Sequence, residues 1–156
     1  MTIQTITDLE GVFATGIHCG IKKVKRDLAL IYVPDAVASA GVFTTNRVAA
    51  PSVSHTRKLV KKAKCLKAVI INSGNANTGI GKVGTQNCQQ MVSLTAKGLG
   101  LTQSEVAVSS TGIIGEKLPM ERLEKGIAEI VKTPQKKEGH LAAEAILTTD
   151  LCKKES

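Results

Sequence analysis

Short runs of Val, Ile and Leu alternate along the chain with longer segments in which apolar residues recur every three or four positions. The short runs, at residues 27–33, 40–46, 68–71 and 104–109, predict β-strands. A proline and an aspartate follow the first run, so we expect the first two strands to form a hairpin or to lie side by side.

Helical spacing is clearest in residues 85–99. Cys88, Met91 and Val92 fall on one face of this segment, and Gly100 follows it as a suitable C-terminal cap. The same spacing predicts three further helices, at residues 54–64, 118–132 and 140–147.

The composition agrees with a sheet that is covered by helices. Only three residues are aromatic, so the core has to be built from Val, Ile, Leu and Ala. Strands followed by alternating strands and helices are typical of proteins that combine both elements. We therefore expect residues 1–156 to form a single domain of the α+β class, a layered mixed sheet covered by helices.

The net charge of +8 is concentrated at residues 22–26 and 57–67. Proteins that bind single-stranded nucleic acid need aromatic side chains on which bases stack, and this chain has almost none. We expect no nucleic-acid partner, and we expect the charge to attract acidic small molecules or an acidic protein.

The cysteines and the N-terminus indicate a cytoplasmic protein. Cys19, Cys65, Cys88 and Cys152 are far apart and have no histidines at ligand spacing, which predicts reduced thiols and no metal site. The polar N-terminus lacks the basic and apolar regions of a signal peptide. No apolar run is long enough to cross a membrane, so we expect no membrane contact.

The segment "SSTGIIG", residues 109–115, carries the clearest candidate chemistry. If it is a loop between a strand and a helix, its backbone N–H groups attract negative charge. Gly112 lets a ligand approach the backbone, and the Thr111 hydroxyl can donate a second hydrogen bond, as an oxyanion hole requires. A turn with a helix cap and a phosphate cradle are the alternatives, although the spacing matches no phosphate-binding motif.

No convincing nucleophile accompanies this site. Cys19 lies beside His18, but a catalytic pair would need a third group and a lowered thiol pKa. In "NSGNAN", the residues Asn72, Asn75 and Asn77 can equally well stabilise the loop or bind a ligand.

Five blocks of sequence together indicate a known family. "GIHCGIKKVKRDLALI", "AGVFTTNRVAAP", "AVIINSGNAN", "VSSTGIIGEKLPM" and "AAEAILTTD" follow one another between Gly11 and Asp150. In content, order and distance they closely resemble the N-terminal (α) half of ornithine acetyltransferase, also called glutamate N-acetyltransferase, of arginine biosynthesis. The chain departs from that family after "NSGNAN", where it has "TGIG" in place of the common "ACTG".

The resemblance implies an acyltransferase that is made as a precursor and cleaves itself before an internal threonine. That threonine, at the N-terminus of a β chain, would carry acetyl from N-acetylornithine to glutamate in a ping-pong cycle. The resemblance also implies that Thr111 and Gly112 form the oxyanion hole and that Thr149, with Thr148 as the near alternative, binds substrate. It implies no cofactor and leaves open whether acetyl-CoA is a second donor.

The family's nucleophilic threonine lies beyond Ser156. We therefore expect this chain to be inactive alone and to assemble with the β chain of the same precursor, in the α2β2 arrangement that the family suggests. The alternative is a non-catalytic basic binding module, or a truncated relic of the family, that keeps the fold without the chemistry.

Overall fold

The computed structural model describes residues 5–62 and 64–150. Within that part of the chain, four strands form one sheet in the order β1-β2-β3-β4. Neighbouring strands pair antiparallel from β1 to β3, whereas β3 and β4 are parallel. The strands are β1 (Phe13–Ile17), β2 (Leu28–Tyr32), β3 (Ala68–Asn75) and β4 (Val106–Ile113).

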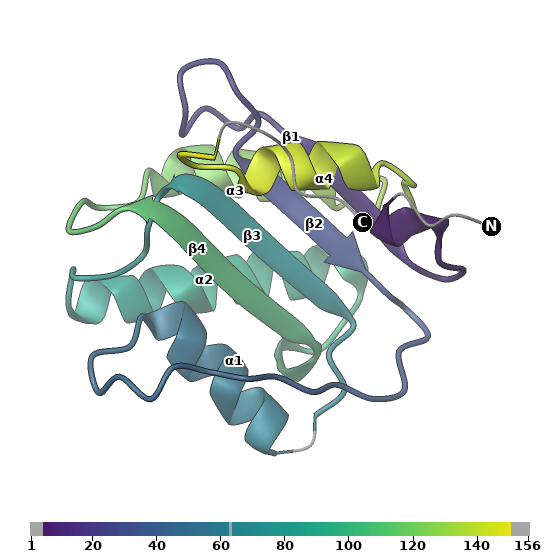
Figure 1. Ribbon diagram of the computed structural model, residues 1–156, viewed down its shortest axis with the longest axis horizontal. Coiled ribbons are helices and arrows are strands. Elements are labelled where there is room, and N and C mark those ends of the chain that lie inside the picture. Colours follow the sequence, from purple (N-terminus) through teal and green to yellow (C-terminus); the bar gives the residue numbers. More distant parts are fainter. Residues whose placement is uncertain (1–4, 63, 151–156) are drawn as a thin grey trace.

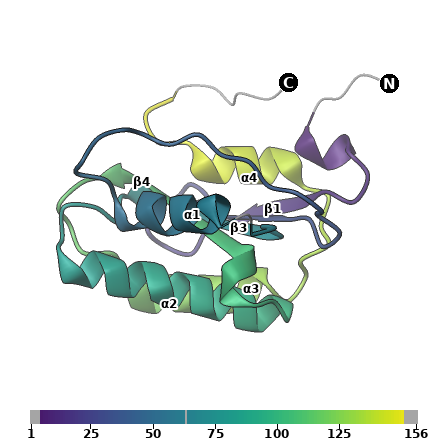
Figure 2. The same ribbon diagram turned by 90° about the horizontal axis from the view of Figure 1, so that it is seen from below.

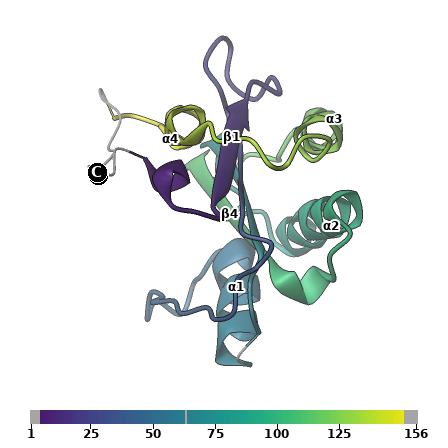
Figure 3. The same ribbon diagram turned by 90° about the vertical axis from the view of Figure 1, so that its right-hand side faces the viewer.

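Helices cover both faces of the sheet and one of its edges. Helix α4 lies on one face, and α2 and α3 lie on the other (Figures 1 and 3). Helix α1 lies along the outer edge of β4 (Figure 2). The helices are α1 (Pro51–Lys61), α2 (Lys82–Leu99), α3 (Met120–Ile130) and α4 (Gly139–Ile146), with short 3-10 turns at Ile6–Asp8 and Gln103–Glu105.

Each face of the sheet has its own apolar cluster. The cluster beneath α4 is small and contains Ala14, Ala29, Ala142 and Ala145. The larger cluster, beneath α2 and α3, confirms the predicted helical faces, because it buries the side chains that share the helical spacing. Its members include Leu28, Leu30, Ile70, Cys88, Met91, Val92, Val106, Val108, Leu123 and Ile127.

The helix bounds agree closely with the predicted ones. Helix α2 ends at Leu99 as expected, and Gly100 follows it in the left-handed conformation that caps a helix. Helix α1 begins at Pro51 and not at Ser54, because the fixed φ of proline suits the first helical position, where its missing N–H is not needed.

The predicted pairing of residues 27–33 with residues 40–46, as a hairpin or as adjacent strands, is wrong. Residues 40–46 form no strand, and Val42 is fully exposed. Strand β2 instead pairs with β1, which the sequence analysis missed, and with β3. The glycine within β1 weakens its strand pattern, but a Cβ on Gly16 would lie 2.2 Å from the Leu141 carbonyl oxygen of α4. Close packing of α4 therefore requires glycine at position 16. The same glycine makes β1 hard to recognise as a strand from the sequence.

The buried carboxylate of Asp27 organises the connection between β1 and β2. It accepts hydrogen bonds from the backbone N–H groups of Cys19, at 2.7 Å, and Lys22, at 2.8 Å. The side chain has no exposed surface, so the backbone donors replace the water that a charged group would otherwise need. This one residue thus fixes the course of the basic loop at residues 18–26.

We expect Asp27→Ala to lower the free energy of unfolding by about 3 kcal/mol, because two backbone donors lose a charged acceptor. Asp35→Ala is the matched control, since Asp35 is exposed, and it should change stability by less than about 0.5 kcal/mol. Chemical denaturation measures both values, and equal midpoints for the two variants would contradict the role of Asp27.

The carboxylate of Glu105 makes the stability of the fold depend on pH. The Thr102 backbone N–H, which donates to the carboxylate at 2.8 Å, and the Lys67 ammonium, at 3.0 Å, lower the pKa of Glu105 from 4.5 to about 2. A carboxylate with a lowered pKa adds stability above its unfolded value, and this is lost as the pH falls through the folded value. Between pH 4.5 and pH 2 the melting temperature should therefore fall more steeply in the parent than in Glu105→Gln. Parallel curves would contradict this, and exposed Glu116→Gln is the control.

Candidate functional site

Thr111 and Gly112 lie inside strand β4. The strand continues to Ile113, and helix α3 begins only at Met120. The expected loop with free donors at a helix N-terminus is therefore wrong. Strand β3 also runs further than predicted, to Asn75. The two parallel strands remain paired up to Asn75 and Ile113, and this pairing explains why both are longer than expected.

Two glycines face each other at the carboxyl end of this pair. Gly112 is the register partner of Gly74, and both have positive φ, +129° and +99°. A Cβ on Gly112 would lie 2.3 Å from the Gly74 carbonyl carbon and 2.6 Å from the Asn75 nitrogen. No side chain fits there, so glycine is required both by conformation and by close approach.

Side chains of helix α1 form hydrogen bonds with the outward-facing backbone groups in the first half of β4. The His55 Nε2 atom lies 3.1 Å from the Val106 carbonyl oxygen. The Thr56 hydroxyl donates to the Val108 carbonyl at 3.3 Å and accepts from the Val108 N–H at 3.4 Å. Val106 and Val108 thus direct their backbone groups away from β3.

The odd-numbered positions next to and within β4 face β3 instead. The Glu105 carbonyl accepts from the Lys67 N–H, and the Ile113 carbonyl accepts from the Ala76 N–H, both at 2.8 Å. In a parallel ladder each residue directs both backbone groups to the same side, and the sides alternate. The N–H of Gly112 is therefore directed off the sheet edge, beyond the contacts that α1 makes.

The side chain of Thr111 lies on the α4 face of the sheet. Side chains alternate between faces, and Val108 belongs to the opposite cluster. Ser73, the register partner of Thr111, shares its face and donates a hydrogen bond to the Ala145 carbonyl of α4. Thr111 is half-buried, and its hydroxyl has no hydrogen-bond partner among the described residues.

Two cavities lie near this edge, but neither is lined by Thr111 or Gly112. One of about 320 Å³ lies against the face of β4, beside Thr56 and Ser109. Another of about 520 Å³ lies between α1 and α2, with Lys58 in its lining. The two predicted donors are outside both spaces.

Thr148 and Thr149 follow helix α4, and both are exposed. The chain leaves α4 above the carboxyl end of β3 (Figure 1). The Ala145 and Leu147 carbonyls there accept hydrogen bonds from the ammonium of Lys22. Sequence analysis missed Ser73 and Lys22, because their partners lie 72 to 125 positions away and no local pattern marks them.

The amide nitrogens of the "NSGNAN" segment donate hydrogen bonds to backbone carbonyls at the end of β3 and beyond it. Asn72 and Asn77 donate to the carbonyls of Asn75 and Gly84, each at 2.7 Å, and Asn75 donates to Lys117 at 3.2 Å. These contacts support the loop-stabilising interpretation. The side-chain oxygens of the three asparagines are buried and have no partner among the described residues.

The geometry argues against Cys19 as a nucleophile. Burial, together with the negative charge of Asp27, raises the pKa of the Cys19 thiol to about 12. Among the described residues no hydrogen bond joins His18 to this thiol, and the His18 Nε2 atom lies 2.8 Å from the Lys22 carbonyl oxygen. Thiolate chemistry near neutral pH is therefore unfavourable here.

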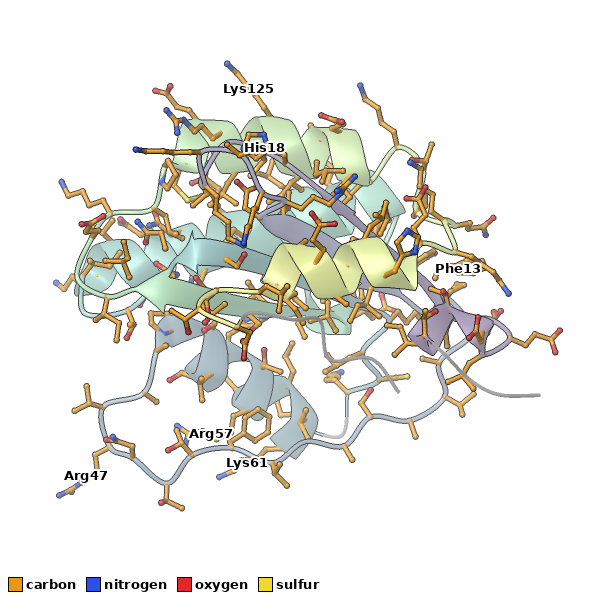
Figure 4. The ribbon with its side chains drawn as sticks, turned by 45° about the horizontal axis from the view of Figure 1, so that its top comes forward. Phe13, His18, Arg47, Arg57, Lys61 and Lys125 are labelled. Atoms are coloured by element: carbon orange, nitrogen blue, oxygen red, sulfur yellow. The ribbon has the colours of Figure 1, made fainter. Side chains whose placement is uncertain are left out.

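The basic residues belong to separate regions of the molecule. Arg57 and Lys61 belong to α1, and Arg47 lies on the segment before it. Lys125 belongs to α3, and His18 lies near that helix, across the sheet (Figure 4). Among residues 5–62 and 64–150, no cluster of three or more His, Cys, Asp or Glu side chains is arranged to hold a metal ion. No helix in this part of the chain is long and apolar enough to cross a membrane.

Solved structures of similar proteins share this fold. The crystal structure of the arginine biosynthesis bifunctional protein ArgJ of Bacillus halodurans superposes with a TM-score of 0.87 at 35% identity, over 95% of this chain and 78% of that one. Ornithine acetyltransferase of Mycobacterium tuberculosis, complexed with ornithine, gives 0.89 at 38% identity, over 97% of this chain and 83% of that one. The predicted α+β class is confirmed.

Sequence comparisons lead to the same proteins. The arginine biosynthesis bifunctional protein ArgJ of Bacillus cereus (strain ATCC 10987 / NRS 248) is 40% identical over 152 residues, which are 97% of this chain and 37% of that protein. Its counterpart in Caldanaerobacter subterraneus subsp. tengcongensis is 43% identical over 141 residues, 90% of this chain and 35% of that protein. The chain thus spans little more than a third of these relatives. The sequence model of the ArgJ family matches residues 13–156, and the chain belongs to this family.

Proposed function

We propose that this chain is the α-subunit part of an acetyltransferase of arginine biosynthesis that moves acetyl from N-acetylornithine to glutamate. The pair of donors at the end of β4 carries the proposal. The Thr111 hydroxyl has no partner among the described residues, and the Gly112 N–H is directed off the sheet edge. Two neighbouring donors on a backbone that is held by strand pairing suit an oxyanion. The ornithine in the similar Mycobacterium tuberculosis structure supports the substrate class.

In the first half of the proposed ping-pong cycle, the N-terminal threonine of a β chain attacks the acetyl carbonyl carbon of N-acetylornithine. The amine of that threonine takes the hydroxyl proton. The carbonyl oxygen becomes negatively charged and accepts hydrogen bonds from Thr111 and Gly112. The carbon–nitrogen bond then breaks, the proton passes to the departing amine of ornithine, and the acetyl group remains as an ester on the threonine.

In the second half, the amine of glutamate attacks the ester carbon. The same two donors stabilise the second oxyanion, and the ester bond breaks as the threonine hydroxyl regains a proton. The products are N-acetylglutamate and the free enzyme. Each donor lowers the barrier by about 3 kcal/mol, because its position requires no reorganisation as the charge forms.

The remaining parts of the proposal concern substrate and partner. Thr149, or Thr148 as the near alternative, binds substrate from the segment after α4. The basic charge of the chain favours the approach of the carboxylate substrates. The β chain arises from the same precursor by autocatalytic cleavage and assembles as α2β2. No cofactor takes part in this proposed reaction.

We expect this chain alone to form no N-acetylglutamate from N-acetylornithine and glutamate, because the attacking threonine belongs to the β chain. Co-expression with the C-terminal part of an ArgJ protein, such as that of Bacillus cereus, should restore the reaction. Mass spectrometry measures the product, and native mass measurement establishes that the two chains assemble. Turnover by this chain alone, or an assembled complex without turnover, would contradict the proposal.

In the assembled complex we expect Thr111→Ala to lower kcat by about 10²–10³-fold, because one oxyanion donor is lost. Stability should change by less than about 0.5 kcal/mol, since the hydroxyl has no partner to lose in this chain. Thr111→Ser should retain most of the activity. Ser109→Ala, two positions earlier on the same face, is the control, and a kcat for Thr111→Ala equal to that of the control would refute the assignment.

A further inference from the structure

The end of helix α4 is held against the strands that carry the proposed site. The Ala145 carbonyl accepts one hydrogen bond from the Ser73 hydroxyl and another from the Lys22 ammonium, the latter at 3.5 Å. The Lys22 ammonium also donates to the Leu147 carbonyl. Since Ser73 is the register partner of Thr111, these contacts join the helix end directly to the site.

The stem of Lys22 makes a second connection to the same strands. A Cβ on Gly74 would lie 3.0 Å from the Lys22 Cγ atom, so the lysine stem crosses directly over this glycine. Gly74 is in turn the register partner of Gly112. The side chain therefore reaches from the close-packed glycine pair to the last carbonyls of α4.

Three backbone carbonyls surround the Lys22 ammonium. The third is the Arg26 carbonyl, which accepts at 3.0 Å. Burial lowers the pKa of Lys22, while the negative charges of Asp27 and Glu144 act in the opposite direction. A cation that binds the last carbonyls also suits the negative end of the helix dipole. These carbonyl contacts indicate a positioning role for Lys22 and not a direct catalytic one.

We propose that Lys22 is a positioning residue that holds the segment after α4 beside the strand carrying Thr111. The carbonyl of Leu147 is bonded to Lys22 and belongs to the peptide unit that leads into Thr148. Fixing it sets where the chain starts toward Thr149. This inference rests on the proposed substrate-binding role of Thr149 or Thr148, and it assigns their placement to a residue more than a hundred positions earlier.

The test compares Lys22→Met with Lys23→Met in the complex assembled with the β chain. Both variants lose one positive charge, but Lys23 is exposed. We expect Lys22→Met to raise KM for N-acetylornithine about tenfold with kcat changed less than about threefold, because binding is lost equally in ground and transition states. Hydrogen exchange of the amides at residues 147–150 should become about tenfold faster in the same variant. Lys23→Met should match the parent in both measurements.

Ser73→Ala is the second variant, in case Lys22→Met does not fold. It removes the other donor to Ala145, so KM and exchange should rise in the same direction. Equal values for Lys22→Met and Lys23→Met would overturn the inference, and so would a raised KM with unchanged exchange. A parent complex without acetyl transfer would instead contradict the proposed function, and the exchange comparison would still decide whether Lys22 holds the segment.

Discussion

The close approach of Gly74 and Gly112 is the constraint on which the site depends. A side chain on Gly112 would collide with the backbone of β3, so the two strands can remain paired to their carboxyl ends only with glycine there. That pairing places Thr111 beside Ser73 and leaves the Gly112 N–H at the edge of the sheet. The backbone that carries both proposed oxyanion donors is thus held by the strand ladder, which favours electrostatic stabilisation of a transition state.

The two faces of the sheet differ in the size of the side chains that they bury and in how closely the helices approach. The face beneath α2 and α3 is filled by large aliphatic side chains and supplies most of the apolar burial. The face beneath α4 has only alanines at its centre, and Gly16 allows the helix backbone to come close. Because α4 lies so near, a side chain as short as that of Ser73 can reach its last turn. The same closeness brings the segment after α4 over the end of β3.

The outer edge of β4 has two parts, one bonded to α1 and one that contains the proposed oxyanion donor Gly112. Exposed strand edges invite unwanted pairing, and α1 covers the first half of this one with hydrogen bonds from His55 and Thr56. Among the described residues, the hydrogen bonds from α1 to this edge reach only as far as Val108, so the part of the edge that contains Gly112 is not paired in the same way. In the proposed enzyme this is where the β chain brings its threonine.

Sequence alone determined the helices, the fold class and the family, because helical spacing and motif order are local properties of the chain. The α2 and α3 faces and the Gly100 cap agree with the prediction. Strand β1 and the pairing of β2 were missed, and a loop was expected where β4 continues. Only the tertiary structure decided these features, as well as the contacts of Ser73 and Lys22, because strand pairing and side-chain hydrogen bonds join residues far apart in sequence that carry no local signal of their partners.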